Sequence, residues 1–370
     1  MCNEPRIVRD NKDMEHILFA GCGYGIYEVF KIKNKNFSML VTTDLHECKQ
    51  QTSAAIDYLN YYDAIDCGIC LGDVQSSNIL GDESWYYEAI KHTKKPFMTI
   101  VGNHDVGNGK DPAASGSSKE FFDKFIRPTA SLSGIEDFNE PHFLKLFDEY
   151  KVALIGLDIF GEVSPLDEEG KYIVPRGAGN ITQSEVDWFI DALSKIPSDY
   201  HLIIGMHMFF DKDEAIDSPW CQRGSNLGCG KGAYGGNDMI PDIVDAWVNG
   251  KALKGEYPAN YDCLPTLTVD CDFSSRGEGI FASYIVGHYH RDILSKSKKY
   301  PYQKIIAFPA TANDRLQNFC SDLPRVPGTR TEDAITVMSL ATKKRQIRLV
   351  RVGSNMSVNM DDRRYLVLDY

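Results

Sequence analysis

The sequence predicts an α/β protein in which two β-sheets pack together and helices flank them. Two observations favour this fold class. Short apolar runs typical of buried strands alternate with amphipathic segments typical of helices. The expected strands also outnumber the expected helices, which suggests two sheets around one core. The 370 residues, 43% of them hydrophobic, suffice for one large domain or two.

The first elements are strands that alternate with helices. Each of these strands is an apolar run of six to eight residues, a length typical of a buried strand. In chain order, we expect a strand at 37–43, a helix at 51–62, a strand at 64–71, a helix at 83–92 and a strand at 96–101. This alternation is typical of α/β folds.

The second half of the chain contains more strands and one strong helix signal. An apolar strand is expected at 152–157. Thr182 and Glu185 have the spacing of a capping box, which predicts a helix at 186–196. The remaining strands are expected at 201–206, 281–286, 303–308, 334–340, 346–352 and 365–369, with a hairpin turn near 343–345.

One segment, 209–279, lacks the alternation of apolar strands and amphipathic helices that the rest of the chain shows. It is rich in glycine and acidic residues, and only 240–248 resembles a helix. Loops this long are usually functional, so we expect an insertion that lies over the active site. The predicted organisation is an N-terminal extension at 1–36, a main domain at 37–310 that contains the insertion at 209–280, and C-terminal strands at 311–370 that complete the same domain.

The net charge of −12 is unevenly distributed along the chain. Residues 291–370 carry 15 basic and 8 acidic side chains, and therefore a net charge of +7. A globally acidic chain repels phosphate, so nucleic acid and anionic membranes are not expected as partners. No apolar window reaches 18 residues, and 17–30 lacks the features of a signal peptide. We therefore expect a cytoplasmic protein.

Ten cysteines are present, and without a secretory signal they are expected to be reduced thiols. Cys67 and Cys70 fall within an apolar strand, where residues three apart point to opposite faces. They are therefore expected to be core residues rather than a metal pair. Two other pairs lie in a polar region and could form disulfides, Cys221 with Cys229 and Cys263 with Cys271.

Residues of metal-binding types follow five of the expected strands. Ligands of α/β sheets bind at the carboxyl ends of strands, so we expect these residues to meet at one edge. In chain order, the motifs are Asp44-Leu45-His46, Gly72-Asp73, Gly102-Asn103-His104-Asp105, His207 and Gly287-His288-Tyr289-His290. Taken singly, each has an ordinary explanation, such as a turn or a core histidine. Together, and in this order, they predict a metal centre.

The order of these motifs resembles that of the calcineurin-like metallophosphoesterase superfamily. The resemblance covers residues 44–290, and every ligand position of the pattern is filled. It implies a four-layer αββα sandwich and a centre with two metal ions, which Asp73 would bridge. The resemblance implies that one ion is held by Asp44, His46, Asp73 and His290, and the other by Asp73, Asn103, His207 and His288.

The resemblance also implies roles for two residues beside the ions. His104 would assist the leaving group, and Asp105 would orient His104 through a hydrogen bond. Two cations about 3.5–4 Å apart neutralise a phosphate ester and lower the pKa of the water that bridges them, so that hydroxide can attack phosphorus. Imidazole, carboxylate and amide ligands suit Mn, Fe, Zn or Co, and the residue types do not distinguish among these four metals.

The sequence thus predicts a metal-dependent hydrolase of a small phosphate mono- or diester. A nucleotide is one candidate substrate, because aromatic side chains after His207 could stack on its base. These aromatic residues, whose more ordinary role is the local core of the insertion, are Phe209, Phe210, Trp220 and Tyr234. Two alternatives stay open: a nuclease with a basic path at 291–370, and a binding module that keeps the fold without catalysis. The oligomeric state is not predicted.

Overall fold

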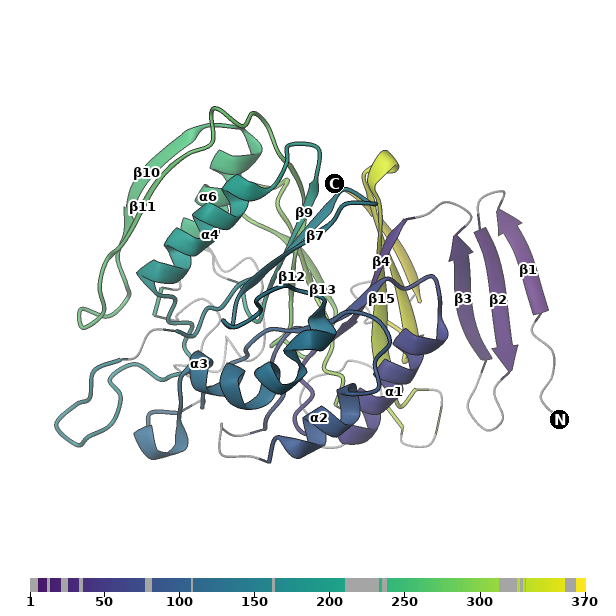
Figure 1. The fold of residues 1–370 in the computed structure, drawn as a ribbon, viewed down its shortest axis with the longest axis horizontal. Helices are drawn as coiled ribbons and strands as arrows, with labels where there is room; N and C mark the ends of the chain where they lie inside the picture. The colour runs from purple at the N-terminus through teal and green to yellow at the C-terminus, as the bar shows by residue number, and fades with distance from the viewer. Residues whose placement is uncertain are drawn as a thin grey trace.

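Two six-stranded β-sheets, named sheet A and sheet B below, form the centre of the molecule (Figure 1). The structure, a computed structural model, describes residues 36–370 except 77–81, 108, 162–163, 210–232, 235–237, 313–324, 327–328, 330 and 357–363. Before residue 36 it describes the backbone of an antiparallel sheet of three strands, β1 (Arg6–Asn11), β2 (Met14–Ala20) and β3 (Ile26–Ile32). The sequence did not indicate these three strands.

Sheet A has the strand order β17-β16-β15-β4-β5-β6. Its parallel half consists of β4 (Phe37–Thr42), β5 (Cys67–Cys70) and β6 (Phe97–Thr99), which are joined by α1 (Lys49–Tyr61) and α2 (Ser84–Ile90). Its antiparallel half consists of β15 (Ala334–Ala341), β16 (Gln346–Gly353) and β17 (Tyr365–Asp369), with a 3₁₀ turn, η4 (Thr342–Lys344), before β16. The C-terminal strands therefore complete the sheet that begins with β4.

Sheet B has the strand order β13-β14-β12-β9-β8-β7. Four of its strands are parallel, β8 (Val152–Gly156), β9 (His201–Met206), β12 (Ile280–Val286) and β14 (Lys304–Ala307). Antiparallel strands close both edges, β7 (Phe143–Phe147) and β13 (Ile293–Lys296). The helices α4 (Gln183–Lys195) and α6 (Met239–Val248) lie together on the outside of this sheet (Figure 1).

The remaining described elements are short. Between β6 and β7 the chain forms η1 (Pro112–Ala114), α3 (Ser118–Phe121), a π-helical turn η2 (Phe122–Ile126) and a 3₁₀ segment η3 (Arg127–Ser133). After α6 it forms an antiparallel pair, β10 (Ala252–Tyr257) and β11 (Leu267–Asp272). The predicted α/β fold with two packed mixed sheets and flanking helices is confirmed.

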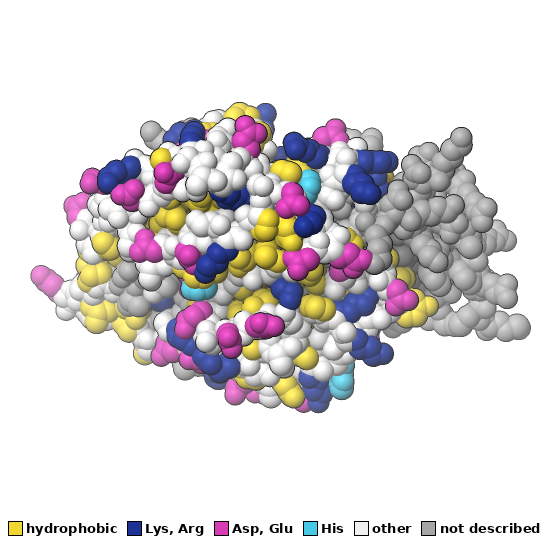
Figure 2. Space-filling view, turned by 45° about the horizontal axis from the view of Figure 1, so that its top comes forward, with side chains coloured by type: hydrophobic (Ala, Val, Ile, Leu, Met, Phe, Trp, Pro, Cys, Tyr) yellow, Lys and Arg dark blue, Asp and Glu magenta, His cyan; other side chains and the backbone are white. Residues whose placement is uncertain are grey.

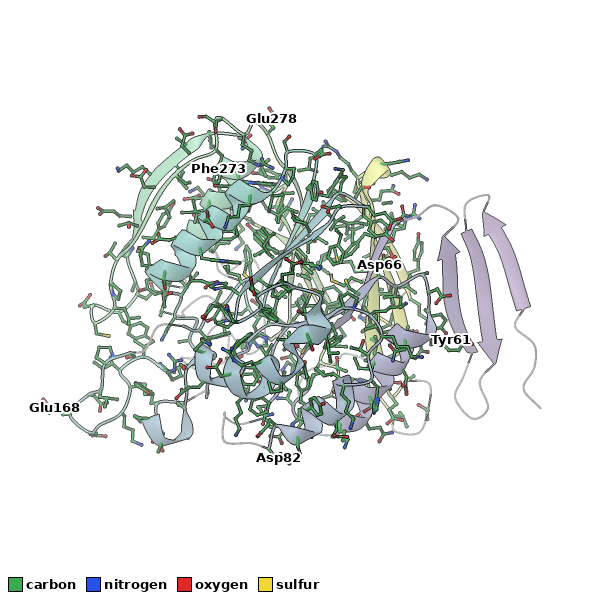
Figure 3. The ribbon with its side chains drawn as sticks, in the orientation of Figure 1. Tyr61, Asp66, Asp82, Glu168, Phe273 and Glu278 are labelled. Atoms are coloured by element: carbon green, nitrogen blue, oxygen red, sulfur yellow. The ribbon has the colours of Figure 1, made fainter. Side chains whose placement is uncertain are left out.

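Burial on both faces explains why the central strands read as continuous apolar runs. Every residue of β4, β5, β6, β8 and β9 is buried. Asp66, labelled in Figure 3, precedes β5 and accepts hydrogen bonds from Ser38 N at 2.8 Å and from Tyr150 Oη at 2.6 Å. Because Ser38 lies in β4 and Tyr150 precedes β8, these bonds link sheet A to sheet B at the amino-terminal ends of the strands.

The expected capping box at the start of α4 is only half formed. Thr182 Oγ1 accepts from Glu185 N at 3.1 Å, as expected. The Glu185 carboxylate instead accepts from Asp158 N at 3.0 Å and contacts His142 Nδ1 at 2.6 Å. Tertiary partners thus replace the local bond to the Thr182 backbone. A complete capping box opens α3, between Ser117 and Glu120, where the sequence analysis expected no helix.

The segment expected to be an insertion contains a crossover helix of sheet B. The helix α6 lies between β9 and β12 in the chain, and Gly279 N, directly before β12, donates at 2.9 Å to Val248 O at the end of α6. Trp247 anchors α6 to α4 through a 2.9 Å bond from its Nε1 to Leu193 O. The described residues 238–280 therefore cover sheet B, whereas 210–232 and 235–237, which include Phe210, Trp220, Cys221 and Cys229, lie outside the described residues.

The structure settles part of the predictions for cysteine and aromatic residues. Cys67 and Cys70 are buried, as predicted, and burial raises the pKa of both thiols. Cys263 and Cys271 are free thiols, so the disulfide that their positions allowed is not formed.

Phe209 and Tyr234 belong to the core rather than to an open stacking surface. The Phe209 ring packs against Tyr284 with centroids 4.7 Å apart. Tyr234 is 1% exposed and donates from its Oη to Pro265 O at 2.9 Å. Of the two interpretations of these aromatic side chains, their burial supports the local core.

Candidate metal centre

All predicted ligands lie in loops that follow the carboxyl ends of parallel strands. The loops after β4, β5 and β6 extend from sheet A, and those after β9 and β12 extend from sheet B. Backbone hydrogen bonds join neighbouring loops: Asp44 N donates to Gly72 O at 2.9 Å, and Gly287 N donates to His207 O at 3.0 Å. The fold therefore brings residues from both sheets to one edge, as the motifs predicted.

The first ligand group comprises Asp44, His46, Asp73 and His290. All four are buried, and their ligand atoms lie within 4.8 Å of one another. His290 Nε2 is 3.0 Å from Asp44 Oδ1 and 3.3 Å from His46 Nε2. His46 Nε2 is 3.9 Å from Asp73 Oδ2. Two imidazoles and two carboxylates thus face one point.

The second ligand group shares Asp73 with the first and adds His207, His288 and Asn103. The ligand atoms of Asp73, His207 and His288 lie within 4.8 Å of one another, and Asp73 Oδ2 is 3.3 Å from His207 Nε2. Asn103 Oδ1 lies 2.9 Å from His207 Nε2 and 2.7 Å from His288 Nδ1. His207 Nδ1 is 2.7 Å from Leu71 O, a bond that orients its Nε2 toward the group.

The hydrogen bonds of the two aspartates leave one oxygen of each for a cation. Asp44 Oδ2 accepts from Thr43 Oγ1 at 2.7 Å and from His288 N at 3.0 Å, and Asp73 Oδ1 accepts from His104 N at 2.8 Å. Asp44 Oδ1 and Asp73 Oδ2 are buried and accept no hydrogen bond. Burial of an acceptor atom without a hydrogen-bond donor costs folding free energy, and a cation bound to that atom removes this cost. The donor set therefore fits metal ions.

Burial and neighbouring charges set the protonation of the ligands. Burial raises the pKa of Asp44, but the charge of the neighbouring His290 outweighs burial and brings this pKa to about 2. Burial lowers the pKa of His46 to about 4. Burial and the charge of His207 lower the pKa of His288 to about 3. Near neutral pH these groups are an ionised carboxylate and neutral imidazoles, the forms that bind metals.

His207 shows that the pocket favours positive charge. Burial lowers its pKa, but the Asp73 carboxylate outweighs burial and raises this pKa to about 9. Asp73 itself has a pKa well below its usual range, because His207 and His104 outweigh the effect of burial. Carboxylates that hold a proton on a fully buried imidazole would hold a metal cation at the same place.

The ligands occupy a backbone conformation that few residues adopt. Among the described residues, nine non-glycine residues have a positive φ. Five of the nine are predicted ligands with φ between 44° and 63°, namely Asp44, His46, Asp73, His288 and His290. Such conformations cost about 1–3 kcal/mol each and concentrate at functional sites. The loops thus orient these side chains toward the site by adopting a backbone conformation that is locally unfavourable.

Two glycines of the motifs are required because the loops approach one another closely. A Cβ on Gly102 would lie 2.2 Å from Asp73 N, and a Cβ on Gly287 would lie 1.9 Å from Thr43 Oγ1 and 2.9 Å from Asp44 Oδ2. Both distances are far below ordinary contact. Glycine at these positions therefore lets the loops that carry the ligands touch.

Gly287→Ala is expected to lower the free energy of unfolding by about 1–3 kcal/mol through overpacking. It should also release metal from the first ligand group, because the new methyl group displaces Thr43 and Asp44. Thermal unfolding and elemental analysis measure the two effects. Gly109→Ala is the matched control, since its Cβ would come no closer than 3.9 Å to another atom. Equal stability and metal content in both variants would contradict the assignment.

His104 and Asp105 have partners that the sequence did not indicate. The His104 ring lies beside His46 with centroids 4.9 Å apart, and its Nδ1 is 2.7 Å from Ser76 O. The Asp105 carboxylate accepts from Gln75 N at 2.9 Å and from Gly102 N at 2.8 Å. The Ser76 carbonyl orients His104, and Asp105 joins the loop after β5 to the loop after β6, whereas the Asp105–His104 bond stays a prediction.

Two further residues support the ligands. Thr43 directly precedes Asp44 and donates to it, a role that the sequence did not indicate because Thr43 ends an expected strand. Asp292, two residues after His290, is 4% exposed and pairs with Arg351. No local pattern links residues 59 positions apart, so the sequence carries no signal for this pair.

Comparison with known proteins gives a family match and similar solved structures. The family model of the calcineurin-like phosphoesterases matches residues 37–225, just over half of the chain. A dimetal phosphatase from Danio rerio has a similar fold, with a TM-score of 0.51, 10% identity, and coverage of 91% of this chain and 100% of that chain. The phosphopantetheinyl hydrolase of Mycobacterium tuberculosis matches with a TM-score of 0.43 and 11% identity, over 75% of this chain and 90% of that chain.

No curated protein matches the chain. Within the described part of the chain, no helix combines the length and hydropathy needed to span a membrane. The matched region includes the strand-end loops that carry Asp44, Asp73, Asn103 and His207. The chain therefore belongs to the calcineurin-like phosphoesterase family and is a metallophosphoesterase, a hydrolase of phosphate ester bonds.

Proposed function

We propose that the chain hydrolyses the phosphate ester of a small molecule with two divalent metal ions, one in each ligand group. The observation that carries this proposal is the shared carboxylate of Asp73, whose unbonded Oδ2 faces both His46 and His207. When bound, two such ions neutralise the phosphate and supply a water of lowered pKa as the nucleophile. Mn, Fe, Zn and Co all suit these ligands.

In this proposal His104 donates a proton to the leaving oxygen from its Nε2. Its Nδ1 faces the Ser76 carbonyl at 2.7 Å and therefore carries a proton, so donation from Nε2 requires the doubly protonated, cationic ring. The ring is half-buried and lies beside the first ligand group, so it can reach the substrate from the solvent side. Asp105 holds the loop backbone that carries His104.

A small substrate is favoured over nucleic acid by the charge of the surface. On the face shown in Figure 2, basic and acidic side chains of the described residues are interspersed rather than collected into a basic track. Nucleic acid binding relies on such a track, and the chain as a whole carries a charge of −12. The similar structure from Danio rerio is also named a dimetal phosphatase, an enzyme of phosphate esters.

Removal of metal is expected to abolish hydrolysis and to lower the melting temperature. A ligand at about 100 times its Kd stabilises the folded state by about 2.7 kcal/mol, so loss of two ions should lower Tm by several degrees. The experiment compares chelated protein with protein reloaded with Mn, Fe, Zn or Co. An aryl phosphate, an aryl phosphodiester and a panel of nucleotides serve as substrates.

Activity that returns only with metal supports the proposal, and the ratio of the two aryl substrates distinguishes monoesterase from diesterase. A metal-loaded protein that hydrolyses none of the substrates would favour a binding module. Undiminished activity in the chelated protein would contradict a metal mechanism altogether.

A further inference from the structure

Two buried arginines from the C-terminal part of the chain support the loops that carry Asp44 and His290. Arg351 lies in β16 and is 3% exposed, and Arg325 lies before β15 and is 8% exposed. Both residues follow the last motif and lie beyond the region that the family model matches. A buried guanidinium is retained only where its donors are satisfied, so the partners of each reveal what it holds.

Arg351 holds the chain that follows His290. Its Nη1 donates to Asp292 Oδ2 at 3.1 Å, and its Nη2 donates to Asp292 Oδ1. Its Nε donates to Thr336 Oγ1 at 2.9 Å, which fixes the guanidinium against β15. A bidentate pair of this kind sets both the position and the direction of the partner backbone. The loop end two residues beyond His290 is thereby fixed to sheet A.

Arg325 holds a short segment, residues 310–312, that follows β14. Its Nη1 donates to Ala310 O at 2.6 Å and to Ala312 O at 2.8 Å. Its Nη2 donates to Thr311 O at 2.8 Å, and its Nε donates to Glu332 O at 2.9 Å. One buried side chain thus satisfies four backbone carbonyls and gives the segment a defined shape.

The segment 310–312 in turn pairs with the backbone of Thr43 and Asp44. Thr311 N donates to Thr43 O at 2.8 Å, and Thr43 N donates to Thr311 Oγ1 at 3.1 Å. Ala312 N is 3.3 Å from Asp44 O. Arg325 therefore supports Asp44 indirectly, because it holds the backbone segment 310–312 that is hydrogen-bonded to Thr43 and Asp44.

The two supports meet in the first ligand group, where Asp44 Oδ1 is 3.0 Å from His290 Nε2. Asp44 and His290 have φ values of 50° and 55°, which persist only when the surroundings hold them. In the second group, His207 is held differently, by β9 and by Leu71 O at 2.7 Å from its Nδ1. Apart from the shared Asp73 and the bond from His288 N to Asp44 Oδ2, the two groups thus depend on different parts of the chain.

We propose that Arg325 and Arg351 are positioning residues for the first ligand group and so set the affinity of one of the two metal ions. This inference rests on the proposed binuclear function. A lysine at either position keeps the positive charge but cannot form the forked contacts of the guanidinium. Arg351→Lys and Arg325→Lys are therefore expected to weaken the binding of one ion about tenfold or more and to leave the other unchanged.

The test titrates Mn²⁺ into the chelated full-length protein and its variants. Equilibrium dialysis gives the two dissociation constants, and electron paramagnetic resonance distinguishes a coupled pair of Mn²⁺ ions from a single ion. Thermal unfolding of each variant is measured alongside. Arg348→Lys is the matched control, because Arg348 lies in the same strand, is similarly buried at 9% exposure, and contacts Gln346 at 3.5 Å.

Selective loss of one ion in both Arg351→Lys and Arg325→Lys, with the control unaffected, supports the proposal. It is overturned if both variants bind two ions as the unmodified protein does, or if both ions weaken equally, which would indicate general loosening. If Arg351→Lys does not fold, Asp292→Asn removes the same ion pair from the other side and decides in its place. An unmodified protein that binds none of Mn, Fe, Zn and Co would instead refute the proposed function.

Discussion

Replacement of Asp73 by asparagine is expected to remove bound metal and phosphoester hydrolysis together. Asp73 Oδ2 faces ligands of both groups, at 3.9 Å from His46 Nε2 and 3.3 Å from His207 Nε2. An amide there is neutral, so the charge that holds two cations near one another is lost. If roughly 4 kcal/mol of transition-state stabilisation disappears, kcat/KM falls by about 10³-fold. Elemental analysis and steady-state kinetics with an aryl phosphate measure both losses.

Asp57→Asn provides the control for Asp73→Asn. Asp57 is an exposed residue of α1, so its variant changes the net charge equally without touching the loops. The asparagine at position 73 keeps the size of the side chain and the acceptor for His104 N, so the fold should persist. Two bound ions and unimpaired turnover in Asp73→Asn would rule out a bridging role for this carboxylate.

His104→Ala is expected to keep both metal ions and to lower kcat by roughly 10²–10⁴-fold, the usual contribution of a general acid. The loss should be larger for an alkyl phosphate than for an aryl phosphate, because a poor leaving group depends more on the donated proton. The measurement compares kcat for the two substrates and the metal content of the variant.

His92→Ala serves as the matched control, because His92 is exposed and follows α2. A His104→Ala protein that loses metal would make His104 a ligand instead. An equal loss for both leaving groups would assign it a role in substrate binding rather than proton transfer.

The fold and the ligand set could be predicted because two signals coincide in the sequence. The strands are short apolar runs buried on both faces, and each run ends where the motif begins: β9, for example, ends at Met206, directly before His207. The carboxyl ends of parallel strands then place the ligands without any knowledge of the loops. The glycines of the motifs add a third signal, since loops that touch exclude a side chain at positions such as Gly287.

Contacts between distant residues could not be predicted in the same way. The partner of His104 is a backbone carbonyl of Ser76, and any residue can supply a carbonyl. Glu185 has the spacing of a capping residue but bonds to Asp158, because a buried tertiary partner outcompetes a local one. The strands β10 and β11 expose every second residue, and this alternation is a weaker signal than a continuous apolar run.

The two halves of the metal centre lie far apart in the sequence, which has a consequence for biosynthesis. Asp44 Oδ2 accepts from His288 N, 244 positions further along the chain. A nascent polypeptide that has emerged from the ribosome only as far as β6 lacks His207, His288 and His290, and pairings this distant form slowly. Capture of the cations therefore belongs to the last stage of maturation, and prematurely terminated chains remain inert toward phosphate esters.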